Sequence, residues 1–258
     1  MPPIARAGFL GLLLLGSLPT FAESPRTYRI TARRLSREAL ATPPQELRSL
    51  EERGKSSVAV VVVPDTREGP PGDGVLDPRF RYDPAVARFL LPTDRIQCGD
   101  PGIARLAAAL PGTRTLEVIR AGLALVSRSV TYDPVLAKAI SEGTASPKDA
   151  LAVLREGTGT CSEYASLFVA LMRSRGIPAR YVVGLLYAPE NDADFVHAWA
   201  ECYLPGHGWL GADPQAGSLG LAPDHIRLFL GMDYPDCGAG PLPQLWPLKA
   251  VRIQSRLP

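Results

Sequence analysis

The sequence predicts a mixed fold of helices and strands in a chain of one or two domains. Apolar residues recur at helical spacing over residues 115–130, and again after a capping signal at Thr160. Two other segments have strand patterns: 58–63 is a continuous apolar run, and 196–204 alternates between two kinds of side chain. A length of 258 residues with 46% hydrophobic residues is enough to bury a core around these elements.

Charge and cysteine content exclude several classes of function. Lys and Arg number 28 against 26 Asp and Glu, and a formal net charge of +2 is too balanced for a nucleic-acid-binding protein or a polybasic membrane anchor. Four cysteines are too few for a disulfide-dense scaffold. None of them stands in a CxxC or CxxH pair, so we expect no metal and no other cofactor.

The first 22 residues have the pattern of a secretory signal peptide. Arg6 supplies a positive charge, residues 7–18 form an apolar run, and Thr20 and Ala22 offer small side chains at a cleavage site. The run has about 12 residues, whereas a membrane-spanning helix needs about 20. We therefore expect a periplasmic or secreted protein with no stable membrane insertion after cleavage; a buried N-terminal helix is the alternative.

Residues 23–100 are expected to form an N-terminal extension that contains β-strands. The segments 28–35 (YRITARRL) and 56–63 (SSVAVVVV) have strand patterns, and an Arg- and Glu-rich segment, 45–55, lies between them. Gly, Pro and Asp are frequent over 65–84, which predicts a long loop. The pattern leaves open whether this extension is a separate domain or a β-layer that completes the core.

Helical patterns follow this loop. Short ones cover 84–91 and 101–110, and a longer amphipathic one covers 115–130. At 146–154 (SPKDALAVL), a serine precedes a proline in the first helical position, which predicts a helix that starts at Ser146.

A cysteine stands at the start of the most clearly marked helix. Residues 160–163 form a T-x-x-E capping box, in which Thr160 accepts from the N–H of Glu163 and the Glu163 side chain reaches back. Cys161 is then the first helical residue. Unpaired N–H groups and the positive end of the helix dipole favour a thiolate there and can stabilise an oxyanion. The alternative is an ordinary buried cysteine.

Residues downstream supply the two other groups that a nucleophilic cysteine needs. An alternating strand carries His197, and the strand after the next turn ends in Asp213. His197 is the expected base, and Asp213 is the expected acceptor that fixes its tautomer. A two-residue turn at 206–207 would place Asp213 opposite Ala200, roughly 10 Å from His197 along the strand. Spacing alone therefore makes these residues neighbours and does not establish a hydrogen bond.

Together these motifs resemble the transglutaminase-like superfamily of papain-fold cysteine enzymes over residues 115–237. The matching segments are G-x-G-x-C-x-E at 157–163, RSRGIPARYVVG at 173–184, HAW at 197–199, GW and ADP within 208–214, and DHIRLFLGMDYPD at 224–236. The resemblance implies an α+β fold: a papain-like transglutaminase core in residues 101–258, with a C-terminal strand, in which the helix bearing the nucleophile packs on an antiparallel β-sheet. It also implies a triad of Cys161 as nucleophile, His197 as general base and then acid, and Asp213 as its orienting partner.

Aromatic side chains are the candidates for a substrate cleft. Tyr132 matches a tyrosine position ahead of the nucleophile in the superfamily. Trp199 and Trp209 are expected either to flank the cleft or to belong to the core. Animal transglutaminases stabilise the oxyanion with a tryptophan upstream of the nucleophile, whereas all three tryptophans here follow Cys161. The backbone N–H of Cys161 is therefore the expected oxyanion donor.

The remaining histidines and cysteines receive structural roles. His207 is expected in a solvated turn, and His225 is expected to pack against or cap a short helix. With Cys161 assigned to catalysis, the pair Cys98 and Cys237, which lie in polar loops, is the expected disulfide. Cys202, on the strand face opposite His197, is expected in the core.

The expected function is that of a periplasmic or secreted cysteine enzyme. It would act on amide bonds of a protein, a peptide or a peptidoglycan peptide through a thioester acyl-enzyme, with hydrolysis and transamidation both open. The alternative from a different class is a non-catalytic transglutaminase-like binding or scaffold module of the cell envelope. A zinc-dependent hydrolase is a third possibility, disfavoured by three histidines scattered along the sequence. No nucleic-acid partner is expected, and the sequence does not fix the oligomeric state.

Overall fold

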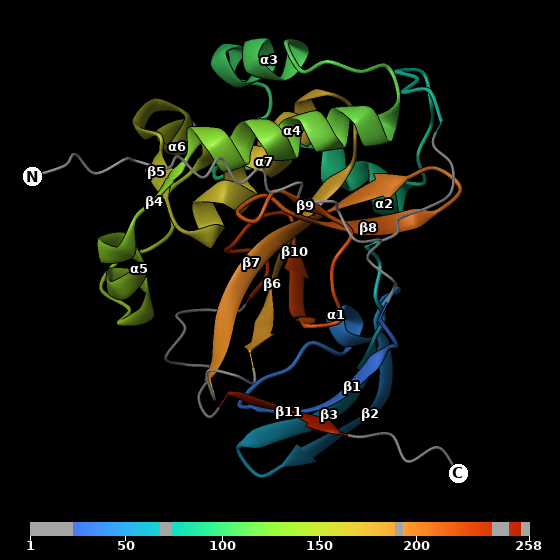
Figure 1. The fold of residues 1–258 in the computed structure, drawn as a ribbon, viewed down its shortest axis with the longest axis vertical. Helices are drawn as coiled ribbons and strands as arrows, with labels where there is room; N and C mark the ends of the chain where they lie inside the picture. The colour runs from blue at the N-terminus through green and yellow to red at the C-terminus, as the bar shows by residue number, and fades with distance from the viewer. Residues whose placement is uncertain (1–22, 68–73, 189–192, 239–247, 254–258) are drawn as a thin grey trace, which may run out of the picture.

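The computed structural model describes residues 23–67, 74–188, 193–238 and 248–253, which are arranged in three layers (Figure 1). Helices gather at one end of the molecule, a five-stranded sheet runs through its middle, and a four-stranded sheet lies at the other end. All the strands of the two larger sheets pair antiparallel. The predicted α+β class is confirmed.

The four-stranded sheet contains the strands predicted near the N-terminus. Its order is β11-β1-β3-β2, with β1 (Arg26–Ala32), β2 (Glu46–Arg53), β3 (Ser56–Val63) and β11 (Lys249–Ile253). Alternate residues of β3 are buried, as expected for a strand with one face on a core. Because β11 pairs with β1, the two ends of the described chain meet in this sheet.

The five-stranded sheet forms the centre of the molecule. Its order is β10-β6-β7-β8-β9, with β6 (Ala179–Ala188), β7 (Ala193–Leu204), β8 (Gly208–Asp213), β9 (Ser218–Leu219) and β10 (His225–Gly231). A separate parallel pair joins β4 (Thr131–Tyr132) to β5 (Thr158–Gly159).

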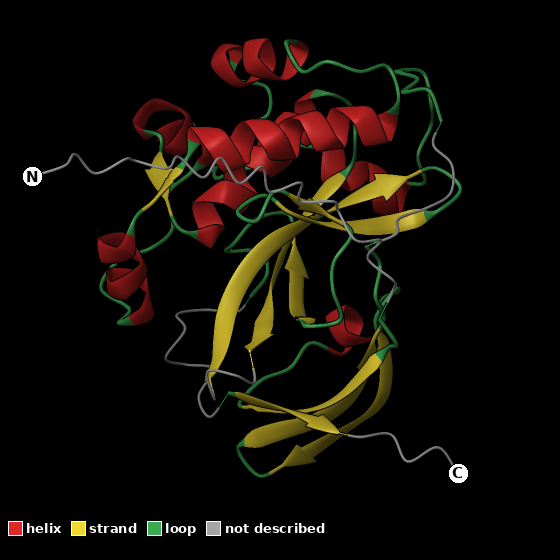
Figure 2. Ribbon diagram, viewed as in Figure 1, coloured by secondary structure: helices red, strands yellow, loops and turns green. Residues whose placement is uncertain are grey.

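The helices lie mostly in one layer (Figure 2). They are α1 (Arg37–Ala41), α2 (Pro84–Ala87) with the 3-10 turn η1 (Arg88–Leu90), α3 (Pro101–Ala108), α4 (Thr115–Ser129), α5 (Pro134–Ser141), α6 (Ala150–Glu156) and α7 (Cys161–Ser174). The helix α7 is buried along almost its whole length, because α3, α4 and α6 pack around it on one side and β6 and β7 on the other. It is therefore the central helix of the fold.

Two apolar cores hold these layers together. One lies among the helices and the adjoining ends of β6, β7 and β8, and includes Phe168 and Met172 of α7. The other joins the N-terminal sheet to the central sheet, and includes Tyr28, Val61 and Ile226, each fully buried. The Tyr28 hydroxyl also donates to the Pro223 carbonyl at 2.7 Å across this junction. The N-terminal sheet thus packs directly on the central sheet.

Three elements of the structure differ from what the sequence predicts or were not predicted. The charged segment at 45–55 contains the strand β2, which is mostly exposed because it is the edge of its sheet. The helix expected to start at Ser146 instead starts at Ala150, because the Asp149 side chain accepts from the Ala152 N–H at 2.8 Å and caps it there. The helix α5, capped by Asp133, was not expected.

The expected disulfide between Cys98 and Cys237 is absent: both thiols are free and buried. The two residues belong to different cores, where Cys98 donates to the Leu90 carbonyl and Cys237 to the Tyr181 carbonyl. Cys202 is buried in the core, as the sequence predicted. Turn-forming residues beside a cysteine do not keep its side chain exposed, since each of these two thiols packs into a core from a turn.

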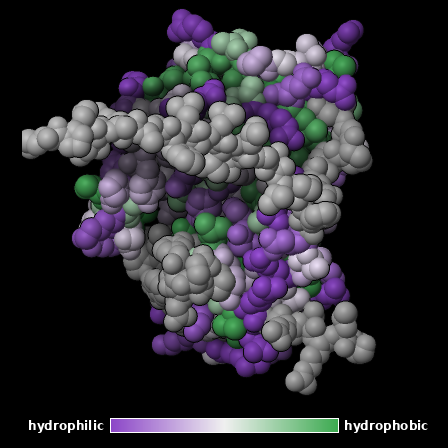
Figure 3. All heavy atoms as spheres, viewed as in Figure 1, coloured by the Kyte–Doolittle hydropathy of each residue, from purple (hydrophilic) through white to green (hydrophobic). Residues whose placement is uncertain are grey.

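Hydrophilic side chains cover the outer edges of the helical layer and much of the N-terminal sheet on the face shown in Figure 3. Within the described ranges, no helix is long and apolar enough to cross a membrane. The predicted signal peptide, residues 1–22, lies outside the described residues.

Candidate active site

Cys161 is the first residue of α7, held there by the predicted capping box. The Thr160 hydroxyl accepts from the Ser162 N–H at 3.3 Å, and the Glu163 carboxylate accepts from the Thr160 N–H at 2.7 Å. Glu163 is fully buried, and its second oxygen accepts from the Lys148 N–H at 2.6 Å. This carboxylate therefore ties the loop before α6 to the start of α7, which fixes the position of the thiol.

Two glycines allow the chain to turn from α6 into α7 and to pack against the buried Glu163 side chain. Gly157 ends α6 with φ +65°, a left-handed conformation that favours glycine. Gly159 lies against Glu163, and a Cβ on it would be 2.2 Å from the Glu163 Cβ. The G-x-G before the cysteine is thus required by the turn and by the packing of the buried carboxylate.

His197 and Asp213 meet because the β7–β8 turn is one residue longer than expected. Leu204 pairs with Gly208, so three residues form the turn, and Ala200 pairs with Ala212. Continuing this register puts Asp213 opposite Trp199, on the face that His197 shares, whereas the two-residue turn put it opposite Ala200. The His197 Nε2 and the Asp213 Oδ2 are 2.9 Å apart.

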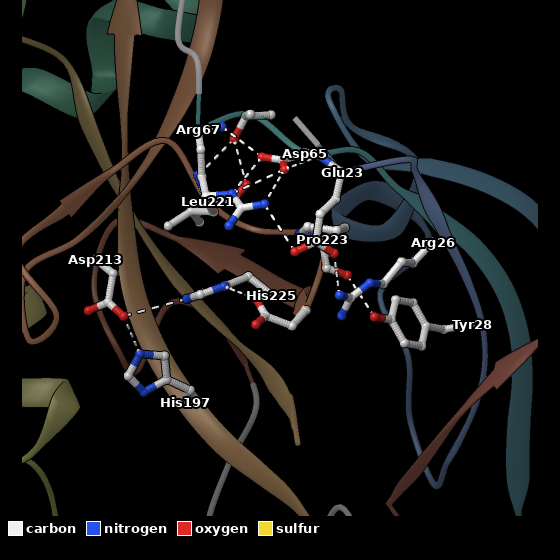
Figure 4. A network of polar contacts seen from close by, with 12 residues as sticks. Glu23, Arg26, Tyr28, Asp65, Arg67, His197, Asp213, Leu221, Pro223 and His225 are labelled. Carbon is white, nitrogen blue, oxygen red and sulfur yellow. Dashed lines mark hydrogen bonds and ion pairs between the residues drawn. The ribbon is translucent and has the colours of Figure 1, made fainter. Parts of the chain in front are cut away.

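The Asp213 carboxylate is fully engaged. Its Oδ1 accepts from the backbone N–H groups of Gln215 and Ala216 at 2.9 and 3.1 Å. Its Oδ2 contacts His197 and also the Nε2 of His225, at 3.5 Å (Figure 4). Burial opposes ionisation of Asp213, but these hydrogen bonds hold its pKa well below the usual range. Asp213 is therefore a fixed anion.

His225 and Asp224 are the site residues that the sequence prediction missed. His225 does not cap a helix: it begins β10, and its Nδ1 contacts the Asp224 Oδ1 at 2.6 Å. Burial lowers the pKa of His225, but the hydrogen bonds to Asp213 and Asp224 raise it overall. The alternation of DHIRLFLG could have identified the strand, but not its place beside Asp213.

Gly184 helps to bring these groups together across the sheet. On β6 it lies opposite His197 of β7 and opposite Arg227 of β10. A Cβ on Gly184 would lie 2.4 Å from the Trp199 ring and 2.2 Å from the Ile226 carbonyl oxygen. The missing side chain leaves room for the indole ring beside His197 and His225.

The imidazole of His197 bridges the thiol and the carboxylate. Burial lowers the pKa of His197, but hydrogen bonds to Asp213 and Cys161 and the negative charge on both raise it to about 10. Because Nε2 is directed at Asp213, the Nδ1 is the ring nitrogen left for the sulfur. At neutral pH this raised pKa keeps the His197 imidazolium protonated beside the Cys161 sulfur.

A cavity of about 300 Å³ opens beside the sulfur. Cys161, His197 and Tyr132 all line it, so Tyr132, which is 47% exposed, stands where a cleft residue was expected. Trp199 and Trp209 do not line this cavity, and Trp199 belongs to a buried cluster, which is the core alternative that the sequence left open. Trp199 is 1% exposed, with its ring 6.1 Å from that of His197 and 5.5 Å from that of His225.

Trp209 lies elsewhere. Its ring packs on Phe89 and Tyr203 and under the Arg180 guanidinium, which is 4.1 Å above the ring centre. His207 is exposed in the β7–β8 turn, as predicted.

Three of the site side chains have the composition of a metal-binding group. The ligand atoms of His197, Asp213 and His225 lie within 4.8 Å of one another. His197 and His225 therefore lie close together in the fold, although the three histidines are scattered along the sequence. Each of these three side chains already has a hydrogen-bonding partner, so hydrogen bonds account for their close approach without a bound ion.

Comparison with known proteins identifies a family model and a solved structure to which this chain is similar. Residues 104–214 match the family model of the transglutaminase-like superfamily. The crystal structure of a "putative cysteine protease" from Cytophaga hutchinsonii superposes with a TM-score of 0.63 at 18% identity, covering 92% of this chain and 94% of that one. This likeness shows the shared fold.

Two sequence relatives match shorter segments. The uncharacterized protein ML0607 of Mycobacterium leprae is 33% identical over 93 residues, which is 33% of this chain. A protein-glutamine gamma-glutamyltransferase of Pseudomonas aeruginosa is 35% identical over 78 residues, which is 27% of this chain. The matched segments span 32% of ML0607 and 11% of the Pseudomonas protein.

Proposed function

We propose that this chain, whose residues 104–214 match the family model of the transglutaminase-like superfamily, is a cysteine enzyme that transfers acyl groups from amides through a thioester at Cys161. The observation that supports this most strongly is the ordered set of Cys161 at a helix N-terminus, His197 and Asp213. Catalysis by a cysteine requires an imidazole between the thiol and a carboxylate, whereas a binding or scaffold module does not require it.

The first half of the proposed reaction forms the acyl-enzyme. The thiolate of Cys161 attacks the amide carbonyl carbon, and a C–S bond forms as the carbonyl π electrons move to oxygen. The N–H of Cys161, at the first position of α7, has no acceptor within its helix and can donate to this oxyanion. The C–N bond then breaks as the His197 imidazolium gives its proton to the departing amine.

The second half releases the acyl group. His197, now neutral, takes a proton from water or from an amine as that nucleophile attacks the thioester. Asp213 keeps the imidazole in the correct orientation and stabilises the imidazolium when it re-forms. Water gives hydrolysis and an amine gives transamidation. The Pseudomonas relative is named for the second reaction.

The proposed substrates are proteins, peptides or peptidoglycan peptides outside the cytoplasm. The signal-like pattern of residues 1–22 supports export to the periplasm or the exterior. We expect the protein recovered from a periplasmic or secreted fraction to have lost these residues, and an intact N-terminal mass would contradict export.

Mass spectrometry of the trapped intermediate tests this function. The protein is incubated with a library of glutamine-containing peptides and peptide amides, with and without a primary amine, and quenched in acid. We expect an acyl adduct on Cys161 with loss of ammonia or an amine, absent in Cys161→Ala. No adduct and no product, from a folded protein whose thiol reacts normally, would contradict the proposal.

A further inference from the structure

A second cavity lies beside the one that contains Cys161. It has a volume of about 210 Å³, and its walls include Arg95, Lys148 and Ser166. Ile140 and Tyr234 line both cavities. The helix α7 passes both, since Cys161 and Ser162 face the first cavity and Ser166 faces the second. A ligand in the second cavity would therefore be a close neighbour of the thiol.

The charge in this second cavity is positive. Its lining contains Arg95 and Lys148 and no carboxylate. Lys148 is partly neutralised, because its Nζ is 2.7 Å from the Glu156 carboxylate. Glu163 lies behind the Lys148 backbone, where its oxygens accept from the N–H groups of Thr160 and Lys148.

Arg95 is the group without a counter-charge. Its Nη1 donates to the Pro147 carbonyl at 3.0 Å, which holds the guanidinium against the cavity wall. Across the described ranges, no Asp or Glu forms a salt bridge with it. By contrast, Arg180 pairs with Glu201, and Arg173 donates to three backbone carbonyls. Arg95 alone among these keeps most of its N–H donors for a ligand.

We propose that this cavity binds a carboxylate of the substrate that reacts at Cys161. A guanidinium forms paired hydrogen bonds with a carboxylate, and its half-buried position strengthens the interaction relative to bulk water. Ser166 lies five residues after Cys161, a rise of about 7.5 Å along α7, which is the reach of about two extended residues. The substrate class is thus a peptide with a free carboxylate about two residues from the reacting amide.

Protection of Cys161 from iodoacetamide tests this inference. Iodoacetamide is neutral, and the protecting ligands are two matched pairs of N-acetyl dipeptides. The first pair, Ala-Glu amide and Ala-Gln amide, differs in a side-chain carboxylate. The second pair, Ala-Ala acid and Ala-Ala amide, differs in the main-chain carboxylate. The concentration that halves the alkylation rate is measured for each.

We expect the acidic member of one pair to protect at a concentration at least tenfold lower than its neutral partner, and that pair identifies the source of the carboxylate. In Arg95→Gln the ratio between the protecting concentrations of the neutral and the acidic member of that pair should fall below twofold. In Arg95→Lys, which keeps the charge without the planar fork, part of it should remain. The exposed Arg128→Gln on α4 is the matched control and should keep the wild-type ratio.

Equal protection within both pairs, or full discrimination in Arg95→Gln, would overturn the inference. An unchanged alkylation rate without ligand shows that each variant keeps the site intact. This inference rests on the proposed function only in placing the ligand beside Cys161. Because protection reports binding, a chain that binds the acids and transfers no acyl group would retain this cavity as a site and lose the proposed function.

Discussion

The protonation of His197 depends on two residues that face it from different elements. Asp213 and Cys161 raise the pKa of His197 to about 10 against the opposing effect of burial. A raised pKa contributes stability that is fully present below the unfolded value of about 6.5 and is lost as the pH rises through about 10. The native site should therefore hold its imidazolium throughout the neutral range.

The pH dependence of unfolding tests this at the residue scale. Between pH 6 and pH 10, the free energy of unfolding of the wild type should fall by about 4 kcal/mol more than that of His197→Gln. The reason is that the variant has no imidazolium to lose. Urea titrations at the two pH values measure the difference. Parallel decreases in the two proteins would show that the pKa of His197 is not raised by folding.

His225 should act through Asp213, and two substitutions separate its two contacts. The amide nitrogen of His225→Gln can replace Nε2 and keep the contact with Asp213, whereas His225→Asn can replace Nδ1 and keep only the contact with Asp224. We expect alkylation of Cys161 at pH 6 to fall about tenfold in His225→Asn, about 1.4 kcal/mol. The fall should be less than threefold in His225→Gln. Equal losses would reduce His225 to a packing residue.

At the scale of elements, the start of α7 could be predicted from sequence more fully than the β7–β8 hairpin. A capping box is a local pattern, and it placed Cys161 correctly at the first helical position. The hairpin register depends on turn length, and glycines at 206 and 208 both adopt positive φ, so the sequence allowed more than one turn. A difference of one residue in the length of this turn decides whether Asp213 lies on the same face of the sheet as His197.

The buried capping carboxylate should be a major stabilising group of this element. Glu163→Ala would leave the N–H groups of Thr160 and Lys148 without their acceptor, and should lower the free energy of unfolding by about 2–4 kcal/mol. Glu142→Ala, which removes an exposed pair with Lys138 on α5, should cost less than about 0.5 kcal/mol. Denaturant titrations compare the two. Similar small losses would mean that the cap does not hold α7 in place.

At the scale of the whole molecule, the sequence predicted the elements of each layer better than their assembly. The patterns of β1 and β3 identified strands but could not show that β11 would pair with β1, since that contact joins residues far apart in the chain. For the same reason, the approach of His225 to Asp213 could not be predicted: β10 reaches the site through its pairing with β6.

The packing of the N-terminal sheet on the central sheet predicts a single unfolding transition. Val61 is fully buried at this junction, and its replacement by alanine should lower the free energy of unfolding by about 2 kcal/mol. Trp199 belongs to β7 and Trp209 to β8, so in a Trp246→Phe background the tryptophan fluorescence reports the central sheet. The fluorescence and circular dichroism midpoints should shift together.

Val62→Ala is the matched control on the other face of β3, where the side chain is half-buried, and should have a smaller effect. If Val61→Ala shifted the circular dichroism midpoint and left the fluorescence midpoint unchanged, the extension would be an independent domain.

The central claim, that Cys161 is a nucleophile activated by His197, is tested most directly by the rate of its alkylation at pH 6. Iodoacetamide is added to the wild type and to His197→Gln, and the modified peptide is quantified by mass spectrometry. We predict that Cys161 reacts at least tenfold faster than glutathione under the same conditions, and that His197→Gln abolishes the excess. A wild-type rate no higher than that of glutathione, and unchanged in His197→Gln, would contradict the account.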